Sequence, residues 1–405
     1  MSESENILVY RLGSLGDMVT ALPAFHLVRR RHPGAIIVLL TNQRVSEKAS
    51  PAWSLLDGSG LFDRFIDYPV GLRHRQQLKE LIQLIRKKRF SICYHMMRPR
   101  GLIKSLRDRL FFAACGIPRV EGVPWRWRQM ACCRRPGPPM GLSEYESETE
   151  RLLTCLPGLG PADLDEPALW DLGLDAVEMD AARQLLEACG VRENFLALCP
   201  GTKQPIKDWG TDNWVRLMQE AARRHGNLGL VTVGSEDERD LADRILQAWP
   251  GPRANFCGLT VPRVAAAVIK KAKLFLGIDS GPMHLAAAVG TSCVAVFSAR
   301  AVPGEWFPWG RRHIVIYHKP PCFGCGLDRC EQYGRKCLTS IGVEEVLEAF
   351  ETALPYAQRA PSVRGWAATR ALIVDAIAIS ADGLQTPQEA LDDAAIRIDE
   401  VLASR

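Results

Sequence analysis

The sequence predicts an α/β protein of two Rossmann-like domains, each built on a doubly wound parallel sheet, with a helical extension at the C-terminus. Three observations lead to this prediction. At 405 residues the chain is long enough for two cores. Short apolar strands alternate with helical stretches in its first part, and the same alternation restarts after residue 175. No short-period repeat is visible, which argues against a solenoid.

The first part reads as strand and helix in turn. Strands are predicted at 7–10, 35–41, 62–69 and 90–96, and helices at 20–32 and 74–89. Residues 118–145 are rich in Pro, Gly, Arg and Trp, which predicts a long loop or flap. We place an N-terminal domain at 1–170, with a polar, Pro-containing linker near 157–175.

The second part repeats this pattern from residue 176. Helices are predicted at 176–189, 211–225, 236–249, 260–272 and 281–290, and strands at 195–200, 228–234, 274–280 and 292–298. We place a second domain at 176–355. The extension at 361–405 reads as two amphipathic helices that could pack on the N-terminal domain or mediate self-association.

Composition places the chain among globular proteins, with 47% hydrophobic and 24% charged residues. No apolar run reaches the roughly 18 residues that a membrane helix needs. The N-terminus MSESENILVYR has no basic region before an apolar core, so we expect no secretory signal. Most of the 13 cysteines are scattered, as in a reducing compartment. We therefore expect a cytoplasmic protein.

Basic residues concentrate in the first part of the chain. Residues 1–150 carry 24 Lys and Arg against 14 Asp and Glu, whereas the remainder carries 27 against 32. Within 73–135 the count is 17 basic against 3 acidic residues. This asymmetry predicts an anionic partner, such as a phosphorylated glycan, an anionic lipid or a nucleic acid.

The stretch RLGSLGD follows the first predicted strand and precedes the first predicted helix. A strand, a Gly-rich turn and a helix are the usual layout of a phosphate cradle, but Asp17 would repel a phosphate there. Gly13 and Gly16 instead suggest a tight turn of the backbone beside Asp17.

The segment GIDSGPMHLAAAVG is the most informative in the second part. A buried strand ends at Asp279, Ser280 and Gly281 turn the chain, and a proline suits the first helical turn. The backbone amides there, with the helix dipole, make an anion site toward which His284 can point. The alternative is a helix of a Rossmann sheet that binds nothing.

Two further loops follow predicted strands of the second part, as a diphosphate site and a ribose site would. The candidate diphosphate ligands are Thr202, Lys203 and Lys207. The candidate ribose ligands are Glu236 and Glu238, with Asp237 between them. Both loops also have alternatives without a ligand. The lysines of the first loop could simply be solvated, and the acidic residues of the second could simply begin a helix.

In this order and spacing, the motifs resemble the ADP-heptose:lipopolysaccharide heptosyltransferase family, glycosyltransferase family 9. They are RLGSLGDMVTALPAF, CPGTKQPIKDWGTDNW, VGSEDERDLA and GIDSGPMHLAAAVGTSCVAVF, and the resemblance covers about residues 6–355. It implies a GT-B fold, whose N-terminal domain binds the acceptor and whose C-terminal domain binds the nucleotide sugar across a cleft. It also implies an inverting reaction that needs no catalytic metal.

The resemblance implies a role for each matching residue. Asp17 matches the catalytic base, with Gly13, Ser14 and Gly16 beside the acceptor. The residues that match the donor site are Thr202, Lys203, Lys207, Glu236, Glu238, Asp279, Ser280, Gly281 and His284. Lys207 and the amides of Ser280 and Gly281 would stabilise the leaving diphosphate as Mg²⁺ does elsewhere.

The basic stretch 73–135 would then hold a phosphorylated acceptor at the inner face of the cytoplasmic membrane. The candidate acceptor ligands are Arg98, Arg100, Lys104, Arg126 and Arg128. Trp125 and Trp127 could stack on sugars or lie at the lipid interface. The alternative is a solvated charged face.

Four cysteines fall close together as CFGCGLDRCEQYGRKC. Their spacing could make a structural Zn²⁺ or iron–sulfur site, although it is not a common paired-knuckle pattern. The residues are Cys322, Cys325, Cys330 and Cys337. No catalytic metal is expected.

The predicted function is transfer of a heptose, or a related sugar, from a nucleoside-diphosphate sugar to a lipopolysaccharide inner core. The alternatives are a glycosyltransferase for another surface polysaccharide or a secondary metabolite, and a non-catalytic nucleotide-sugar-binding protein. A nicotinamide dehydrogenase is disfavoured because RLGSLGD lacks the G-x-G-x-x-G spacing. Nucleic acid is not expected as a partner, because Asp17 would then have no role.

Overall fold

The computed structural model describes residues 5–43, 51–69, 74–135 and 143–357, and single positions between 386 and 397. Residues 1–357 form one compact unit and residues 358–405 another. In the second unit, the Thr386 hydroxyl donates to a Glu389 carboxylate oxygen at 2.7 Å and accepts the Glu389 N–H at 3.3 Å. The rest of the predicted helical extension lies outside the described residues.

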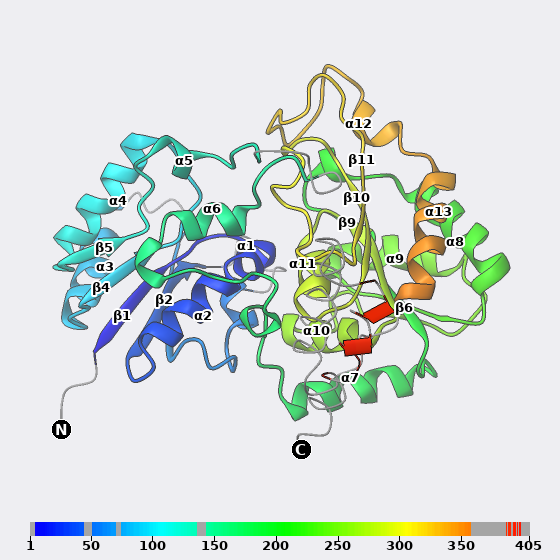
Figure 1. Cartoon of the computed structure of the whole chain (residues 1–405), viewed down its shortest axis with the longest axis horizontal. Helices are drawn as coiled ribbons and strands as arrows, with labels where there is room; N and C mark the ends of the chain where they lie inside the picture. The colour runs from blue at the N-terminus through cyan, green and yellow to red at the C-terminus, as the bar shows by residue number, and fades with distance from the viewer. Residues whose placement is uncertain are drawn as a thin grey trace. The chain divides into compact units, whose positions relative to one another are not determined.

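The first sheet has five parallel strands in the order β3-β2-β1-β4-β5 (Figure 1). They are β1 (Asn6–Tyr10), β2 (Ile36–Asn42), β3 (Arg64–Tyr68), β4 (Ile92–His95) and β5 (Arg119–Glu121). The order reverses between β1 and β4, so ligands are expected where these two strands end. We call this sheet, with helices α1 to α6, the first lobe.

Helices cover both faces of this sheet. They are α1 (Leu15–Thr20), α2 (Leu22–Arg31), α3 (Arg75–Lys87), α4 (Leu102–Ala114), α5 (Trp127–Met130) and α6 (Glu148–Thr154). Side chains of α3 and α4 pack on Leu8 and Tyr10 of β1, whereas α1, α2 and α6 pack with Ile7 and Val9 on the other face. This division follows from the alternation of side chains along a strand.

The second sheet has six parallel strands in the order β11-β10-β9-β6-β7-β8. They are β6 (Phe195–Cys199), β7 (Gly229–Thr232), β8 (Arg253–Asn255), β9 (Leu274–Ile278), β10 (Cys293–Phe297) and β11 (Ile314–Tyr317). The order reverses between β6 and β9. The prediction of two doubly wound halves is confirmed, although the sequence reading missed β8 and β11.

The helices of the second lobe surround this sheet. They are α7 (Ala176–Ala188), α8 (Thr211–His225), α9 (Arg239–Leu246), α10 (Pro262–Lys271), α11 (Gly281–Ala288), α12 (Lys336–Thr339) and α13 (Val343–Ala353). All except the last two were predicted. In the described parts of the chain, no helix is long and apolar enough to cross a membrane.

Two predicted irregular regions are more ordered than expected. Residues 118–145 were predicted as a loop, but they contain β5, α5 and a β-bridge between Arg134 and Tyr145. The supposed linker at 157–175 buries Leu169 and Trp170, and the Trp170 ring stacks on Trp309 at 6.0 Å. In the second of these regions, Leu169 and Trp170 are the apolar anchors. The predicted boundary between 170 and 176 falls between the two sheets and stays a prediction as a domain boundary.

Candidate active site

Asp17 lies in the first turn of α1, at the carboxyl end of β1. Ser14 is the N-cap residue, and its backbone N–H and hydroxyl donate to Asp17 Oδ2 at 2.7 and 2.9 Å. Gly13 has a φ of +143°, and a Cβ there would overlap the Asp17 side chain. The sequence reading placed Asp17 in the turn; the S-x-x-D spacing is the capping-box signal that places it inside the helix.

A buried arginine lies directly beneath Asp17. Arg11 is fully buried, and its Nε and Nη2 donate to the Asp17 carbonyl at 3.1 and 3.0 Å. Its Nη2 also lies 3.8 Å from Asp17 Oδ1, while Nη1 donates to the Met96 carbonyl at 2.6 Å. Arg11 therefore ties the start of α1 to the end of β4 across the reversal of strand order.

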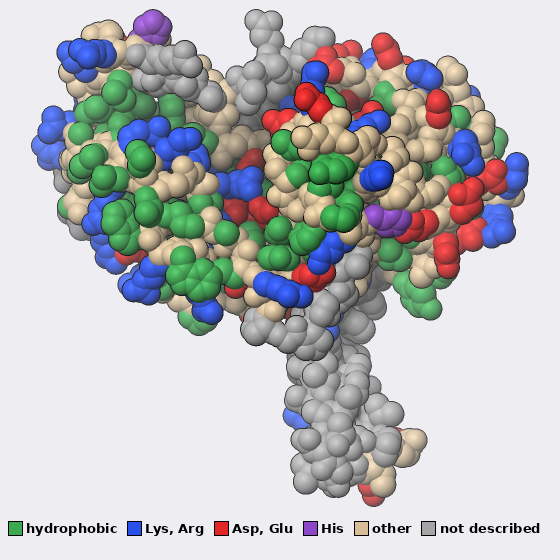
Figure 2. Space-filling view, turned by 90° about the horizontal axis from the view of Figure 1, so that it is seen from above, with side chains coloured by type: hydrophobic (Ala, Val, Ile, Leu, Met, Phe, Trp, Pro, Cys, Tyr) green, Lys and Arg blue, Asp and Glu red, His purple; other side chains and the backbone are tan. Residues whose placement is uncertain are grey.

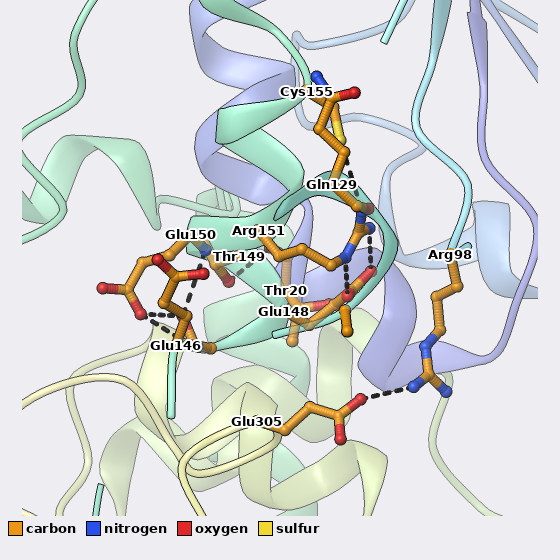
Figure 3. A network of polar contacts seen from close by, with 12 residues as sticks. Thr20, Arg98, Gln129, Glu146, Glu148, Thr149, Glu150, Arg151, Cys155 and Glu305 are labelled. Atoms are coloured by element: carbon orange, nitrogen blue, oxygen red, sulfur yellow. Dashed lines mark hydrogen bonds and ion pairs between the residues drawn. The ribbon is translucent and has the colours of Figure 1, made fainter. Parts of the chain in front are cut away.

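Glu148 completes this buried network from α6. Its carboxylate accepts from Arg151 at 2.6 and 2.8 Å (Figure 3). It also accepts from Arg11 at 3.3 Å, and all three side chains are buried. Burial alone would raise the pKa of Glu148, but the hydrogen bonds and charges of Arg151, with the Arg11 charge, hold that pKa below its usual value. The sequence reading missed these residues, because nothing local marks Arg11, Glu148 or Arg151 as buried.

The donor-site candidates of the second lobe gather where β6 and β9 end side by side. Lys207 Nζ lies 2.8 Å from Asp279 Oδ2 and donates to the Asp279 carbonyl at 3.3 Å. Asp279 is buried, and Ser280 is the N-cap residue of α11, with its hydroxyl 3.8 Å from Cys199 Sγ. The structure thus brings Lys207, Asp279, Ser280 and Gly281 to one edge of the sheet.

The adjoining loops after β6 and β7 meet at Glu238. A Cβ on Gly201 or on Gly234 would overlap the Glu238 carboxylate, so that side chain lies between the two turns. Burial raises the pKa of Glu238, although it accepts the Ser235 N–H at 2.8 Å. Thr202 is turned onto its own loop, because its hydroxyl oxygen accepts the Gln204 N–H at 3.0 Å.

The other two donor-site candidates of these loops are exposed. Lys203 lies on the surface of the loop after β6. Glu236 is also exposed and forms an ion pair with Arg239 at 3.3 Å. Of the two predicted ribose ligands, only Glu238 is therefore enclosed by the loops.

His284 lies where the two lobes touch. A Cβ on Gly16 would be 3.0 Å from its ring, and the Trp306 ring is 6.1 Å away. Likewise, a Cβ on Gly281 would be 2.9 Å from Leu15 Cβ, so α1 and α11 are in close contact. Burial lowers the pKa of His284 to about 4; the Asp279, Lys207 and Asp17 charges also act on it. The start of α1, which carries Asp17, and the start of α11, next to the Lys207–Asp279 pair, therefore meet beside a neutral imidazole.

The buried histidines predict acid sensitivity. Burial also lowers the pKa of His313 to about 4, against an ordinary value of 6.5. Between pH 6.5 and 4 the unfolded chain therefore binds more protons than the folded chain, so the free energy of unfolding falls as the pH drops through this window. We expect a loss of at most about 3 kcal/mol for each histidine, measured by urea unfolding at several pH values.

Substitution of His313 separates this effect from general acid denaturation. Its Nδ1 accepts the Cys293 N–H at 3.2 Å, and its Nε2 faces the Trp309 carbonyl at 2.9 Å, so a second proton has no acceptor. The variant His313→Gln should show a shallower pH dependence. His74→Gln, at an exposed position, should keep the original one. An unchanged slope in His313→Gln contradicts the assignment.

The acceptor candidates of the first lobe are scattered. Arg98 donates to Glu305 of the second lobe at 2.6 Å (Figure 3), and its guanidinium lies 4.7 Å from the Trp306 ring centre. Arg100 is paired with Asp108 at 2.7 Å. The remaining candidates, Lys104, Arg126 and Arg128, are exposed on or beside α4 and α5. Of these candidates, only Arg98 thus lies near the buried network of Arg11, Glu148 and Arg151. The link is Glu305, whose backbone carbonyl accepts the Glu148 N–H at 2.9 Å.

The four clustered cysteines are not arranged as a metal site. Over the described ranges, no group of three or more His, Cys, Asp or Glu side chains could hold a metal ion. Cys330 accepts the Arg335 N–H at 3.4 Å, and hydrogen bonds from backbone N–H groups lower the pKa of its thiol. As placed, the thiols do not fit a zinc or iron–sulfur ligand set, and the predicted structural metal stays a prediction.

The geometry defines a class of enzyme. Two Rossmann-like lobes touch through α1 and α11, and both helices start at carboxyl ends of strands. The first lobe presents the Asp17 carboxylate, and the second lobe presents Lys207 beside the N-terminus of α11. This arrangement is that of a GT-B glycosyltransferase. The model of glycosyltransferase family 9 (heptosyltransferase) matches residues 148–331. Over these residues the chain is similar to glycosyltransferase family 9, the family that its motifs resemble.

Known proteins agree with this assignment over most of the chain. Lipopolysaccharide heptosyltransferase 3 of Escherichia coli K12 is 26% identical over 363 residues, which cover 86% of this chain and 97% of the relative. The solved family 9 glycosyl transferase of Veillonella parvula has a TM-score of 0.68 at 19% identity, covering 88% of this chain and 99% of its own. The solved E. coli ADP-heptose lps heptosyltransferase II has a TM-score of 0.59 at 22% identity, covering 87% of this chain and 99% of its own. The two structures support the GT-B fold.

Proposed function

We propose that this enzyme transfers a heptose, or a closely related sugar, from a nucleoside-diphosphate sugar to a lipopolysaccharide inner-core acceptor. ADP-heptose is the proposed donor. The names of the similar heptosyltransferases support the sugar and the acceptor. The observation that carries the proposal is the close contact of α1, which carries Asp17, with the start of α11, next to the Lys207–Asp279 pair.

We propose an inverting single displacement with Asp17 as the base. The acceptor hydroxyl oxygen bonds to C1 of the sugar while the bond from C1 to the diphosphate oxygen breaks. The hydroxyl proton passes to Asp17 Oδ1 or Oδ2, and the bonding electrons leave with the diphosphate. Ser14 orients the Asp17 carboxylate through its two hydrogen bonds, and Arg11 holds the Asp17 backbone.

The leaving diphosphate gains charge as the bond to C1 breaks. We propose that Lys207 and the amides of Ser280 and Gly281 stabilise it. The ion pair with Asp279 fixes Lys207 at the end of β9, close to the start of α11. We propose that a ribose hydroxyl donates to the half-buried Glu238 carboxylate, which lies between the two turns.

We also propose that the reaction needs no metal ion and that the enzyme works at the cytoplasmic face of the inner membrane. The basic side chains Lys104, Arg126 and Arg128 would meet the phosphorylated acceptor there. Turnover is expected to persist in EDTA, because Lys207 and the helix amides supply the positive charge. A loss of turnover in EDTA that added Mg²⁺ restores would contradict this, and metal analysis of the same sample tests the cysteine cluster.

Calorimetry with a panel of nucleoside diphosphates tests the donor assignment. We expect ADP to bind more tightly than UDP or CDP, and Lys207→Ala to weaken ADP binding at least about tenfold through loss of a charge-assisted contact. Lys203→Ala, at an exposed position in the same loop, is the matched comparison and should have a smaller effect. Preference for a pyrimidine diphosphate would contradict the heptosyltransferase assignment and leave the fold unchanged.

A further inference from the structure

Helix α4 presents its apolar side chains to solvent. Leu102, Ile103, Leu106 and Leu110 are all exposed, Ile103 to 86%. At 3.6 residues per turn these four positions fall within an arc of about 100° on the helix surface. A surface helix normally turns such a stripe toward the core. Packing within the first lobe therefore does not explain the apolar stripe of α4.

The opposite side of α4 is fixed to the first lobe. Ser105, Asp108 and Phe112 are buried, and the Phe112 ring packs edge-on against Tyr10 at 5.1 Å. Asp108 accepts from Arg100 at 2.7 Å and lies 3.2 Å from His95 Nε2. Because these contacts hold the helix, it cannot rotate to bury the apolar stripe.

Basic and aromatic side chains accompany the stripe. Arg107 and Arg109 flank it on the helix, and in residues 102–114 the single carboxylate, Asp108, is buried. Trp125 and Trp127 follow β5 and are 58% and 73% exposed. Figure 2 looks onto this side of the first lobe and shows hydrophobic side chains interspersed with Lys and Arg. Apolar groups with Trp and Arg nearby are typical of a helix at a membrane interface.

We propose that α4 lies in the interface of an anionic phospholipid bilayer, with its apolar stripe among the acyl chains. Arg109 then meets the lipid phosphates, Arg107 stays paired with Asp108 beside the stripe, and Trp125 and Trp127 lie at the headgroup level. This deepens the proposed function and rests on it, since a lipid-linked acceptor must be reached at the membrane. A second copy of the chain fits less well, because a twofold contact through the stripe brings the same arginines together.

Co-sedimentation of the full chain with vesicles tests the docking surface. We expect binding to vesicles of phosphatidylcholine with phosphatidylglycerol, and weaker binding to phosphatidylcholine alone or at high salt. The triple variant Ile103→Ser, Leu106→Ser, Leu110→Ser should lose at least about tenfold in vesicle affinity, because each exchange removes buried apolar surface. Arg109→Gln should lose less.

The control replaces equally exposed apolar residues of the second lobe. Val177→Ser with Leu259→Ser and Val261→Ser should bind vesicles as the wild type does. All substitutions are at exposed positions, and circular dichroism checks that the chains fold. Wild-type binding that the triple variant retains, or no binding by the wild type, overturns the proposal. So does a concentration-dependent dimer that the triple variant abolishes.

Turnover on a detergent-solubilised acceptor separates this inference from the proposed function. The triple variant should turn over as fast as the wild type when no bilayer is present. If vesicle binding follows the stripe but neither chain transfers sugar, the proposed function is wrong and the membrane contact stands. If both chains transfer sugar and the triple variant binds vesicles as well as the wild type, the membrane contact is wrong and the proposed function stands.

Discussion

Replacing Glu148 with alanine is expected to lower the free energy of unfolding by about 3–5 kcal/mol, the usual cost of removing one partner from a buried ion pair. The carboxylate is shared by two fully buried guanidinium groups, those of Arg11 and Arg151. Neither can reach water when the carboxylate is removed. Urea unfolding at neutral pH, followed by circular dichroism, measures the effect.

A surface ion pair provides the matched control. Glu220 pairs with Arg223 at 2.7 Å on α8, where both side chains are exposed. Glu220→Ala should cost no more than about 1 kcal/mol, because exposed pairs contribute little. If Glu148→Ala lowers the free energy of unfolding no more than this control does, the buried network is not what mainly stabilises α6. Glu148→Gln, which keeps one acceptor, should fall between the two.

Replacing Asp17 with asparagine is expected to reduce turnover by about 10²- to 10⁴-fold, the usual contribution of a positioned general base. Asparagine has the same shape but cannot take the acceptor proton. The Ser14 hydrogen bonds can persist through its amide oxygen, so the start of α1 should remain folded. Nucleoside diphosphate affinity, measured by calorimetry, should stay as in the wild type because the proposed donor site lies in the second lobe.

Asp212→Asn is the control for this exchange, since Asp212 is an exposed residue in the first turn of α8. It should leave both turnover and nucleotide binding unchanged. Full turnover in Asp17→Asn would show that another group is the base. Loss of turnover together with loss of donor binding would instead point to a structural role for Asp17.

Local sequence patterns predict much of the fold and part of the site. Buried strands followed by glycine and small polar residues place Gly13, Asp17, Ser280 and Gly281 at carboxyl ends of strands, where the structure has them. Parallel sheets make this inference sound, because their ligand sites lie at that edge. The pairing of Lys207 with Asp279 joins residues 72 positions apart, and the adjacency of β6 and β9 brings it about.

What escaped prediction depends on which charged groups become buried. Arg11 and Arg151 have the composition of surface residues, and only the packing of α6 against β1 and β4 encloses them with Glu148. Arg98 is exposed and paired with Glu305, and its predicted role in binding the acceptor stays a prediction. The exposed stripe of α4 was missed because no helix was predicted at residues 102–114.

The central claim is that the two lobes carry a base and a donor site for one sugar transfer. Release of ADP from ADP-heptose by the full chain, with and without a deacylated lipopolysaccharide inner core, tests it most directly. The claim predicts ADP release that depends on the acceptor, persists in EDTA and nearly disappears in Asp17→Asn. Acceptor-independent release, or no release from ADP-heptose while a pyrimidine diphosphate sugar is consumed, would contradict it.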